Sequence, residues 1–148
     1  MSDRPAMASS ERLADERIQR FLGTKDVGVL ATLGADGAPH GMAMWFLHTA
    51  DAILMLSVAG LQKVRDVQRD PRVAVVAESV GANGATLGVS LRGRAELLAE
   101  SPERQALVER FLAKYHPRLE RLWGARAMPS NRVMFKIAPS HVRSWGLG

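Results

Sequence analysis

The sequence predicts a mainly β chain with inserted helices, an α+β fold in which six or seven antiparallel strands close into a small barrel. Short apolar runs bounded by turn residues recur along the chain, and helical patterns interrupt the series at a few points. Closing such a sheet removes its exposed edges. The 148 residues, 47% of them hydrophobic, fit one domain over 10–148 after a flexible start at 1–9.

A helix and a three-stranded meander open the predicted domain. The helix is expected over 10–22, where Ser9 and Ser10 offer caps and Gly23 ends the pattern. Its apolar residues recur at helical spacing: Leu13, Ile18, Phe21 and Leu22. The meander follows as strands at 27–33, 39–48 and 52–58, and the Asp-Gly pair at 36–37 marks a hairpin between the first two.

The middle of the chain predicts a short helix followed by two strands. The helix spans about 60–69 and ends before Pro71, because a proline disfavours helical geometry in the preceding residue. The strand at 72–79 is too continuously apolar to have one face in water. After a loop, the strand at 88–98 alternates clearly, with one dry face: Val89, Leu91, Gly93, Ala95 and Leu97.

Two helices and two strands complete the chain. Ser101 and Pro102 form a cap and a first helical residue, and apolar residues then recur at helical spacing: Leu107, Val108, Phe111, Leu112 and Tyr115. A short helix is expected at 117–123. The last two strands are expected at 132–139 and 141–146, with a break at the proline that ends the first of them.

Several function classes lack sequence support. The chain has no cysteine, no G-x-S-x-G serine elbow and no paired spacing among its four histidines, so neither a metal site nor a catalytic residue is predicted. The glycines between 81 and 88 precede a strand and are interpreted as a loop. No segment has the length of a membrane span or the pattern of a signal peptide, so a cytoplasmic protein is expected.

The net charge of +5 and the pI of about 10.4 raise anionic partners as candidates. Aromatic residues are only 5% of the chain and are not interleaved with the basic ones, which argues against nucleic acid. The stretch GLQKVRDVQRDPRVAVVA offers a more local anion site, since Lys63 falls in the first turn of the expected helix. A solvated surface lysine is the alternative interpretation of that residue.

The order of several segments resembles the pyridoxamine 5′-phosphate oxidase-like split-barrel superfamily, and more narrowly its flavin or deazaflavin oxidoreductases, which use FMN or coenzyme F420. The similar segments are VGVLATLGADGAPH, MWF, SVAGLQKVRDVQRDPRVAVV and APSHVRSWG. They extend over nearly the whole chain, from Val27 to Gly146. The resemblance implies an FMN-binding split barrel and a homodimer with the cofactor at the subunit interface.

The resemblance also implies cofactor-binding residues. Lys63, eight residues before Pro71, matches the lysine that binds the cofactor phosphate, and Gln62 lies beside it. The other matching positions are Ala43, Met44, Trp45 and Phe46 along the ring edge, Leu56 and Ser57 near the phosphate or ribityl chain, and Trp145 donated by the other subunit. Leu61 and Arg143 depart from the family pattern, so pyridoxamine phosphate is not expected as the substrate.

The expected function is hydride transfer between F420, as first choice, or FMN and a small electron-poor organic substrate. Trp45 or His40 is a candidate for polarising a substrate carbonyl. An acidic cofactor tail could contact Arg65, Arg69 and Arg72, or these could simply face water. The alternative is a haem- or flavin-binding module without turnover, for storage, sensing or tetrapyrrole degradation, with one of two histidines as iron ligand: His40 or His141.

Overall fold

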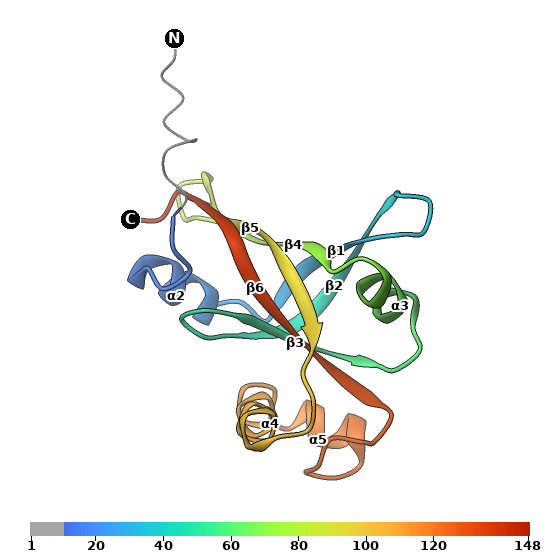
Figure 1. Ribbon diagram of the computed structural model, residues 1–148. Helices are drawn as coiled ribbons and strands as arrows, with labels where there is room; N and C mark the ends of the chain where they lie inside the picture. The colour runs from blue at the N-terminus through green and yellow to red at the C-terminus, as the bar shows by residue number, and fades with distance from the viewer. Residues whose placement is uncertain (1–10) are drawn as a thin grey trace.

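The computed structural model describes residues 11–148 as a closed barrel of six antiparallel strands with four helices outside it (Figure 1). The strands follow one another around the barrel in the order β1-β2-β3-β6-β5-β4. Their bounds are Val27–Leu33 (β1), Pro39–His48 (β2), Ile53–Val58 (β3), Arg72–Val80 (β4), Thr86–Leu97 (β5) and Arg132–Trp145 (β6). The helices are Glu16–Gly23 (α2), Gln62–Arg69 (α3), Pro102–Lys114 (α4) and Arg118–Trp123 (α5). The predicted fold class is confirmed.

The predicted hairpin joins β1 to β2. Gly37 adopts a φ of 83°, which other residues rarely tolerate, and the Asp36 carboxylate accepts a hydrogen bond from the Ala38 amide at 3.0 Å. The register then runs from Leu33 opposite Pro39 to Val27 opposite Trp45. The Asp-Gly turn identified in the sequence therefore forms the predicted hairpin.

Two apolar cores hold the chain together. The first fills the barrel, with strand residues such as Leu30, Phe46 and Phe135 nearly inaccessible to solvent, and α2 and α3 add their apolar faces to it. The second lies between α4 and the outer face of the β2-β3-β6 sheet, where Phe111 and Leu112 are buried. In Figure 1, α4 and α5 accordingly lie together on one side of the barrel, apart from α2.

The ladder between β2 and β3 is short, and this shapes the region of interest. It covers only Phe46 opposite Met55, Leu47 opposite Leu54 and His48 opposite Ile53. Beyond Met55, β3 continues to pair with β6, whereas β2 continues to pair with β1. The two strands therefore separate and leave an opening in the barrel wall.

Two predicted starting residues were wrong. The first helix begins at Glu16, because Asp15 caps it through the Arg17 amide at 2.8 Å. Ser9 and Ser10, and the flexible start predicted for 1–9, lie outside the described residues. Strand β5 begins at Thr86 rather than at Gly88, since it continues the hairpin with β4.

The predicted break at Pro139 is also wrong, because β6 is one continuous strand from Arg132 to Trp145. The pairing with β5 shifts at this point, from His141 opposite Arg92 to Pro139 opposite Gly93, so the proline lies beside a bulge. Gly93 has no side chain, and a Cβ atom added at this position would lie only 2.9 Å from the Pro139 Cα. The glycine thus allows the close approach that keeps the strand intact.

Candidate functional site

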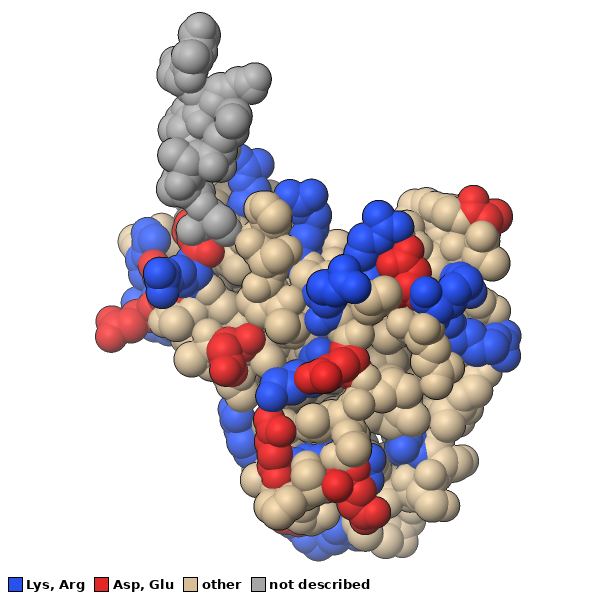
Figure 2. All heavy atoms as spheres, viewed as in Figure 1, with Lys and Arg blue, Asp and Glu red and all other residues tan. Residues whose placement is uncertain are grey.

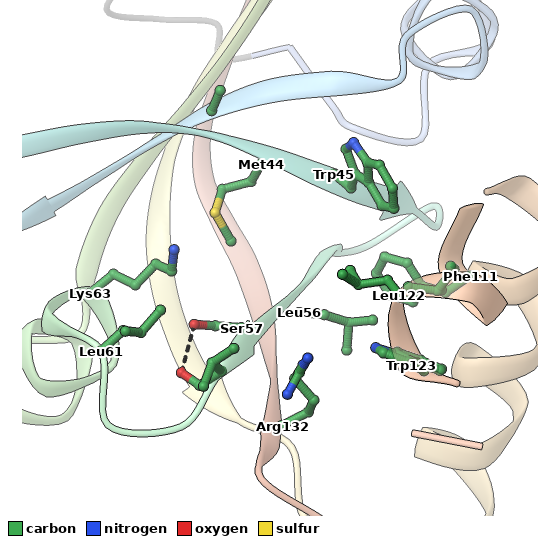
Figure 3. A pocket seen from close by; sticks show the side chains of 13 residues that line it. Met44, Trp45, Leu56, Ser57, Leu61, Lys63, Phe111, Leu122, Trp123 and Arg132 are labelled. Atoms are coloured by element: carbon green, nitrogen blue, oxygen red, sulfur yellow. Dashed lines mark hydrogen bonds between the residues drawn. The ribbon is translucent and has the colours of Figure 1, made fainter. Parts of the chain in front are cut away.

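A cavity of about 380 Å³ occupies the opening between β2 and β3. Residues from both strands, from α3, from the α4-α5 pair and from the start of β6 meet there (Figure 3). Its lining consists of Ala43, Met44, Trp45, Leu56, Ser57, Val58, Leu61, Lys63, Phe111, Leu119, Leu122, Trp123 and Arg132. The volume is in the range of small-molecule and cofactor sites, about 300–1,000 Å³.

One side of the cavity is a strand edge without a β3 partner. Ala43, Met44 and Trp45 pair with β1 on their other side, and the β2-β3 ladder starts only at Phe46. Backbone amide and carbonyl groups need hydrogen-bond partners. This edge of β2 can therefore hydrogen-bond a flat polar ligand in the way that a neighbouring strand would.

Two cations and a hydroxyl line the same cavity. Lys63 comes from the first turn of α3, Arg132 is the first residue of β6, and Ser57, itself buried, is the second-last residue of β3 (Figure 3). The cross-strand pairing of Arg132 with Val58 places it beside Ser57. Within residues 11–148, neither Lys63 nor Arg132 forms an ion pair. Their charges are thus available to an anionic ligand.

The helix that carries Lys63 has an open N-terminus. Leu61 stands at its N-cap position, and no side chain makes a capping hydrogen bond there. The chain reaches this point through Gly60, whose φ is 84°. First-turn amide groups and the positive end of the helix dipole favour an anion at such a helix start. Lys63 adds a full positive charge to that local effect.

The opposite side of the cavity is apolar and comes from α4 and α5. Phe111 and Leu119 are buried, whereas Leu122 is 65% exposed and stands at the rim (Figure 3). Trp123 completes this wall. Aromatic and aliphatic side chains of this kind favour contact with the face of a planar ligand.

Tyr115 fixes this wall to the barrel. Its ring stacks on Trp45 at a centroid distance of 4.5 Å, and its hydroxyl accepts a hydrogen bond from the Phe46 amide at 2.8 Å. The hydroxyl can donate to the carbonyl of Asp26 at 2.7 Å or to that of Phe46 at 2.9 Å. Burial raises the pKa of Tyr115 to about 12. The hydroxyl thus joins α4 to the point where β1 and β2 begin to pair.

The structure brings together six of the nine predicted cofactor residues. Those that line the cavity are Ala43, Met44, Trp45, Leu56, Ser57 and Lys63. Phe46 instead faces the barrel core at 1% exposure, and Gln62 hydrogen-bonds Asp66 on its own helix. Trp145 packs on Gly88 at the far end of β6 from Arg132. That any of these nine contacts a cofactor stays a prediction.

The three arginines left open by the sequence bind the protein itself. Arg65 donates to the Gly60 carbonyl at 2.8 Å and to Gln62. Arg69 donates to the Leu33 carbonyl and to Asp66, and Arg72 pairs with Asp70 at 2.7 Å. None of the three lines the cavity. On the face drawn in Figure 2, basic and acidic side chains are intermixed rather than separated into patches.

Sequence reasoning missed Arg132 and the apolar wall. Arg132 lies far from Lys63 along the chain, and only the β3-β6 register brings it to the cavity. The α4-α5 segment has an ordinary amphipathic pattern, so nothing in its spacing distinguishes a ligand wall from a core helix. The one usable signal was Leu61, which departs from the family pattern two positions before Lys63 and so leaves a second cation to come from elsewhere.

The histidines lie outside the cavity lining. The His48 Nδ1 donates to the side-chain oxygen of Gln19 at 2.8 Å, and burial lowers the pKa of His48. His116 pairs with Glu120, His141 is exposed, and His40 contacts Asp66 at 3.1 Å. No group of three or more potential metal ligands occurs among residues 11–148. None of the helices in that range is long and apolar enough to cross a membrane.

Comparison with solved structures supports the architecture. The conserved hypothetical protein Rv2991 from Mycobacterium tuberculosis is 29% identical, with a TM-score of 0.71, over 88% of this chain and 83% of that one. A FAD-binding protein from Mesorhizobium loti is 22% identical, with a TM-score of 0.68, over 84% and 87% of the two chains. The heme storage protein HutZ from Vibrio cholerae is 16% identical, with a TM-score of 0.74, over 93% and 98%. No curated protein matches the chain in sequence.

The sequence model of one family covers nearly the whole fold. The model described as pyridoxamine 5′-phosphate oxidase matches residues 14–146, from the segment before α2 to the end of β6. It therefore includes every strand of the barrel and every element that lines the cavity. The chain belongs to the pyridoxamine 5′-phosphate oxidase family, with the split-barrel fold of that superfamily.

Proposed function

We propose that this protein is an oxidoreductase that binds a phosphate-bearing flavin or deazaflavin, FMN or F420, in the cavity between β2 and β3. Its substrate would be a small electron-poor organic molecule. The observation that carries the proposal is the pair of cations, Lys63 and Arg132, beside the free edge of β2, which form no ion pair with any carboxylate of residues 11–148. A phosphate and a planar ring with polar edges together match these two features.

The residues fit such a group along the whole cavity. Lys63 and Arg132 would hold the phosphate, together with the first-turn amides of α3. The Ser57 hydroxyl, which donates to the Val58 carbonyl at 2.9 Å, would join them by turning its proton to the phosphate. The β2 edge at Ala43–Trp45 would hydrogen-bond the ring, and the α4-α5 wall would cover its face. The FAD-binding relative from M. loti shows that a protein of this fold binds a flavin, which supports the assignment.

The chemistry of hydride transfer would be supplied by the bound flavin or deazaflavin. The protein would bind and orient it and exclude water through apolar residues such as Leu122 and Trp123. Within the described lining, Lys63 and Arg132 are the ionisable side chains, and no carboxylate or imidazole accompanies them.

The choice between F420 and FMN rests on the acidic tail of F420. Arg65, Arg69 and Arg72, which were candidates for contacting that tail, are occupied by contacts within the protein. The three arginines therefore give no reason to prefer F420 over FMN, and both cofactors belong in the test. Pyridoxamine phosphate, doubted as substrate from the sequence, can be included as a third ligand.

The decisive experiment is a fluorescence titration of the purified protein with FMN and, separately, with F420. Lys63→Ala and Arg132→Gln should each weaken binding roughly 10- to 100-fold, because a hydrogen bond to a charged group contributes about 1.5–3 kcal/mol. Arg121→Gln is the matched control, since Arg121 is exposed on α5 and does not line the cavity. Tight binding of neither cofactor, or binding unaffected by both cavity variants, would refute the proposal.

We also propose that the protein acts as a homodimer. Val27 and Val29 are 41% and 40% exposed on the outer face of β1, and Val76 and Ala43 flank Val29 on β4 and β2. Because Ala43 also lines the cavity, this apolar face continues to the ligand site. A second copy seated there would help to close the cavity, and the family resemblance implies that its own Trp145 would then reach the cofactor.

Light scattering coupled to gel filtration tests this proposal. Val29→Asp should convert a dimer into a monomer, because it places a charge in the centre of the proposed interface. Val80→Asp is the control, since Val80 is 70% exposed at the end of the β4-β5 hairpin, on the same side of β4 as Val76 but four residues beyond it. A wild-type protein that is monomeric at all concentrations would contradict the dimer.

The second candidate function is haem or flavin binding without turnover. One observation favours His40 as an iron ligand: its Nδ1 lies 3.1 Å from the buried Asp66 carboxylate, which would orient the ring with Nε2 free. HutZ shares the fold with this chain. Haem added to the protein should then give a Soret band that is lost in His40→Ala or, alternatively, in His141→Ala, and a spectrum equal to free haem would exclude this function.

A further inference from the structure

A buried carboxylate lies beneath the helix that carries Lys63. The Asp66 side chain has no solvent exposure and accepts hydrogen bonds from four side chains. The donors are Thr32 at 2.8 Å, Gln62 at 2.7 Å, Arg69 at 3.0 Å and His40 at 3.1 Å. Asp66 itself does not line the cavity.

The four donors come from three separate elements. Gln62 and Arg69 are the first and last residues of α3, whereas Thr32 belongs to β1 and His40 to β2. Both ends of the helix are therefore tied through one carboxylate to the two strands below it. Arg65 extends the network, because it donates to Gln62 and to the Gly60 carbonyl before the helix.

Besides Asp66, few contacts attach this helix to the strands, among them the hydrogen bond from Arg69 to the Leu33 carbonyl at 2.6 Å. The helix has eight residues, no capping side chain at its N-terminus, and two buried apolar side chains, Val64 and Val67. A helix this short is marginal on its own, so tertiary contacts decide where it lies. Asp66 is its one buried side chain that hydrogen-bonds the strands, and Lys63 lies one turn before it.

We propose that Asp66 is a positioning residue that sets the place of Lys63 and of the first turn of α3 for phosphate binding. It would do so without touching the ligand. This inference rests on the proposed function, since it assumes that Lys63 meets the phosphate of FMN or F420. It makes Asp66 a determinant of selectivity for phosphorylated cofactors over their phosphate-free forms.

The hydrogen bonds require an ionised side chain at this position. Burial alone raises the pKa of Asp66, but hydrogen bonds from Gln62, Thr32, Arg69 and His40 outweigh it and hold the pKa well below its usual value. An asparagine amide would remove the negative charge that pairs with Arg69 and would turn one acceptor into a donor, so that Thr32 and His40 would have to accept instead of donate, or one donor would lose its partner. Asp66→Asn therefore changes the network while keeping the side-chain volume.

The experiment compares the affinity of the protein for FMN with its affinity for riboflavin, which lacks the phosphate. The wild type should prefer FMN, and Asp66→Asn should reduce that preference roughly 10-fold or more, comparable to losing one hydrogen bond to a charged group. Thr32→Val, which removes a single neutral donor, should reduce it less. Asp70→Asn is the matched control: it lies four residues later, pairs with Arg72 outside the network, and should leave the preference unchanged.

General damage to the fold would lower both affinities together, so the ratio separates positioning from instability. Combining Asp66→Asn with Lys63→Ala should add little to the loss of preference caused by Lys63→Ala alone, because both act on the same contact. A wild type that prefers FMN and an Asp66→Asn variant that keeps this preference would overturn the inference and leave the proposed function standing. A wild type that binds neither FMN nor F420 would overturn both. If it binds only F420, the same ratio is measured against the corresponding deazaflavin without phosphate.

Discussion

Removing the hydroxyl of Tyr115 tests how the α4-α5 wall is attached to the barrel. In Tyr115→Phe the ring stays and can still stack on Trp45, so the variant isolates the contribution of the hydroxyl. The Phe46 amide, which donates to this hydroxyl at 2.8 Å, loses its acceptor in a residue that is 1% exposed. The Phe46 carbonyl keeps a partner, because the Lys114 ammonium donates to it at 2.8 Å.

The expected loss of stability follows from that unpaired amide. Leaving one buried donor without a partner costs about 1–3 kcal/mol, and we take about 2 kcal/mol as the central value. For a chain of this size that corresponds to a melting temperature lower by about 4–8 °C. Cofactor binding should weaken less than in Lys63→Ala, since the phosphate site lies on α3 and β6 rather than on α4.

A pH titration measures the ionisation of the same hydroxyl directly, because Tyr115 is the single tyrosine of the sequence. Its pKa of about 12 in the folded protein exceeds the usual value of 10. The folded state therefore holds the phenol proton more tightly, so this stabilisation is complete below pH 10 and is lost as the pH rises toward 12. Absorbance at 295 nm should show tyrosinate in the folded protein only near pH 12, and the signal should vanish in Tyr115→Phe.

Two results would refute this reasoning. One is a tyrosinate midpoint near pH 10 in protein whose circular dichroism shows it still folded. The other is a Tyr115→Phe variant that melts at the wild-type temperature. Either would mean that water or another group satisfies the Phe46 amide, and that the apolar contacts of α4 and its hydrogen bond from Lys114 to the Phe46 carbonyl hold it without help from Tyr115.

Three further predictions concern other parts of the chain. Gly88→Ala should destabilise the protein by roughly 1–3 kcal/mol, because an added Cβ would lie 2.8 Å from an atom of the Trp145 ring. Urea unfolding measures this loss, and an unfolding midpoint equal to that of the wild type would contradict it. The folded protein lowers the pKa of Asp66 and lowers that of Asp70 to about 2. The ionised side chains therefore stabilise the fold above about pH 4, and this stabilisation is lost as the pH falls. Between pH 5 and pH 2.5 the wild type should consequently lose more stability than Asp66→Asn. Leu122→Asp should change the free energy of unfolding by less than about 0.5 kcal/mol, since Leu122 is 65% exposed, yet weaken cofactor binding; equal affinity would remove α5 from the site.

The sequence by itself determined the elements and most of one side of the site. The Asp-Gly turn, the apolar alternation of β5 and the serine-proline start of α4 are local signals, and each produced the structure that it predicts. Lys63 could be selected because a helix start and its charge lie next to each other in the chain. The first helix and the break at Pro139 were predicted wrongly, since Asp15 competes as a cap and a bulge opposite Gly93 accommodates the proline.

Only the tertiary structure decided how the site is completed. Arg132 joins Lys63 through a strand register, the β2 edge is free because β3 turns away to pair with β6, and Asp66 collects donors from three elements. Such contacts join residues that are far apart in sequence, and their positions depend on how the barrel closes rather than on any local pattern. For the same reason Arg65 and Arg69, which the sequence offered as ligand contacts, instead hold the helix that presents Lys63.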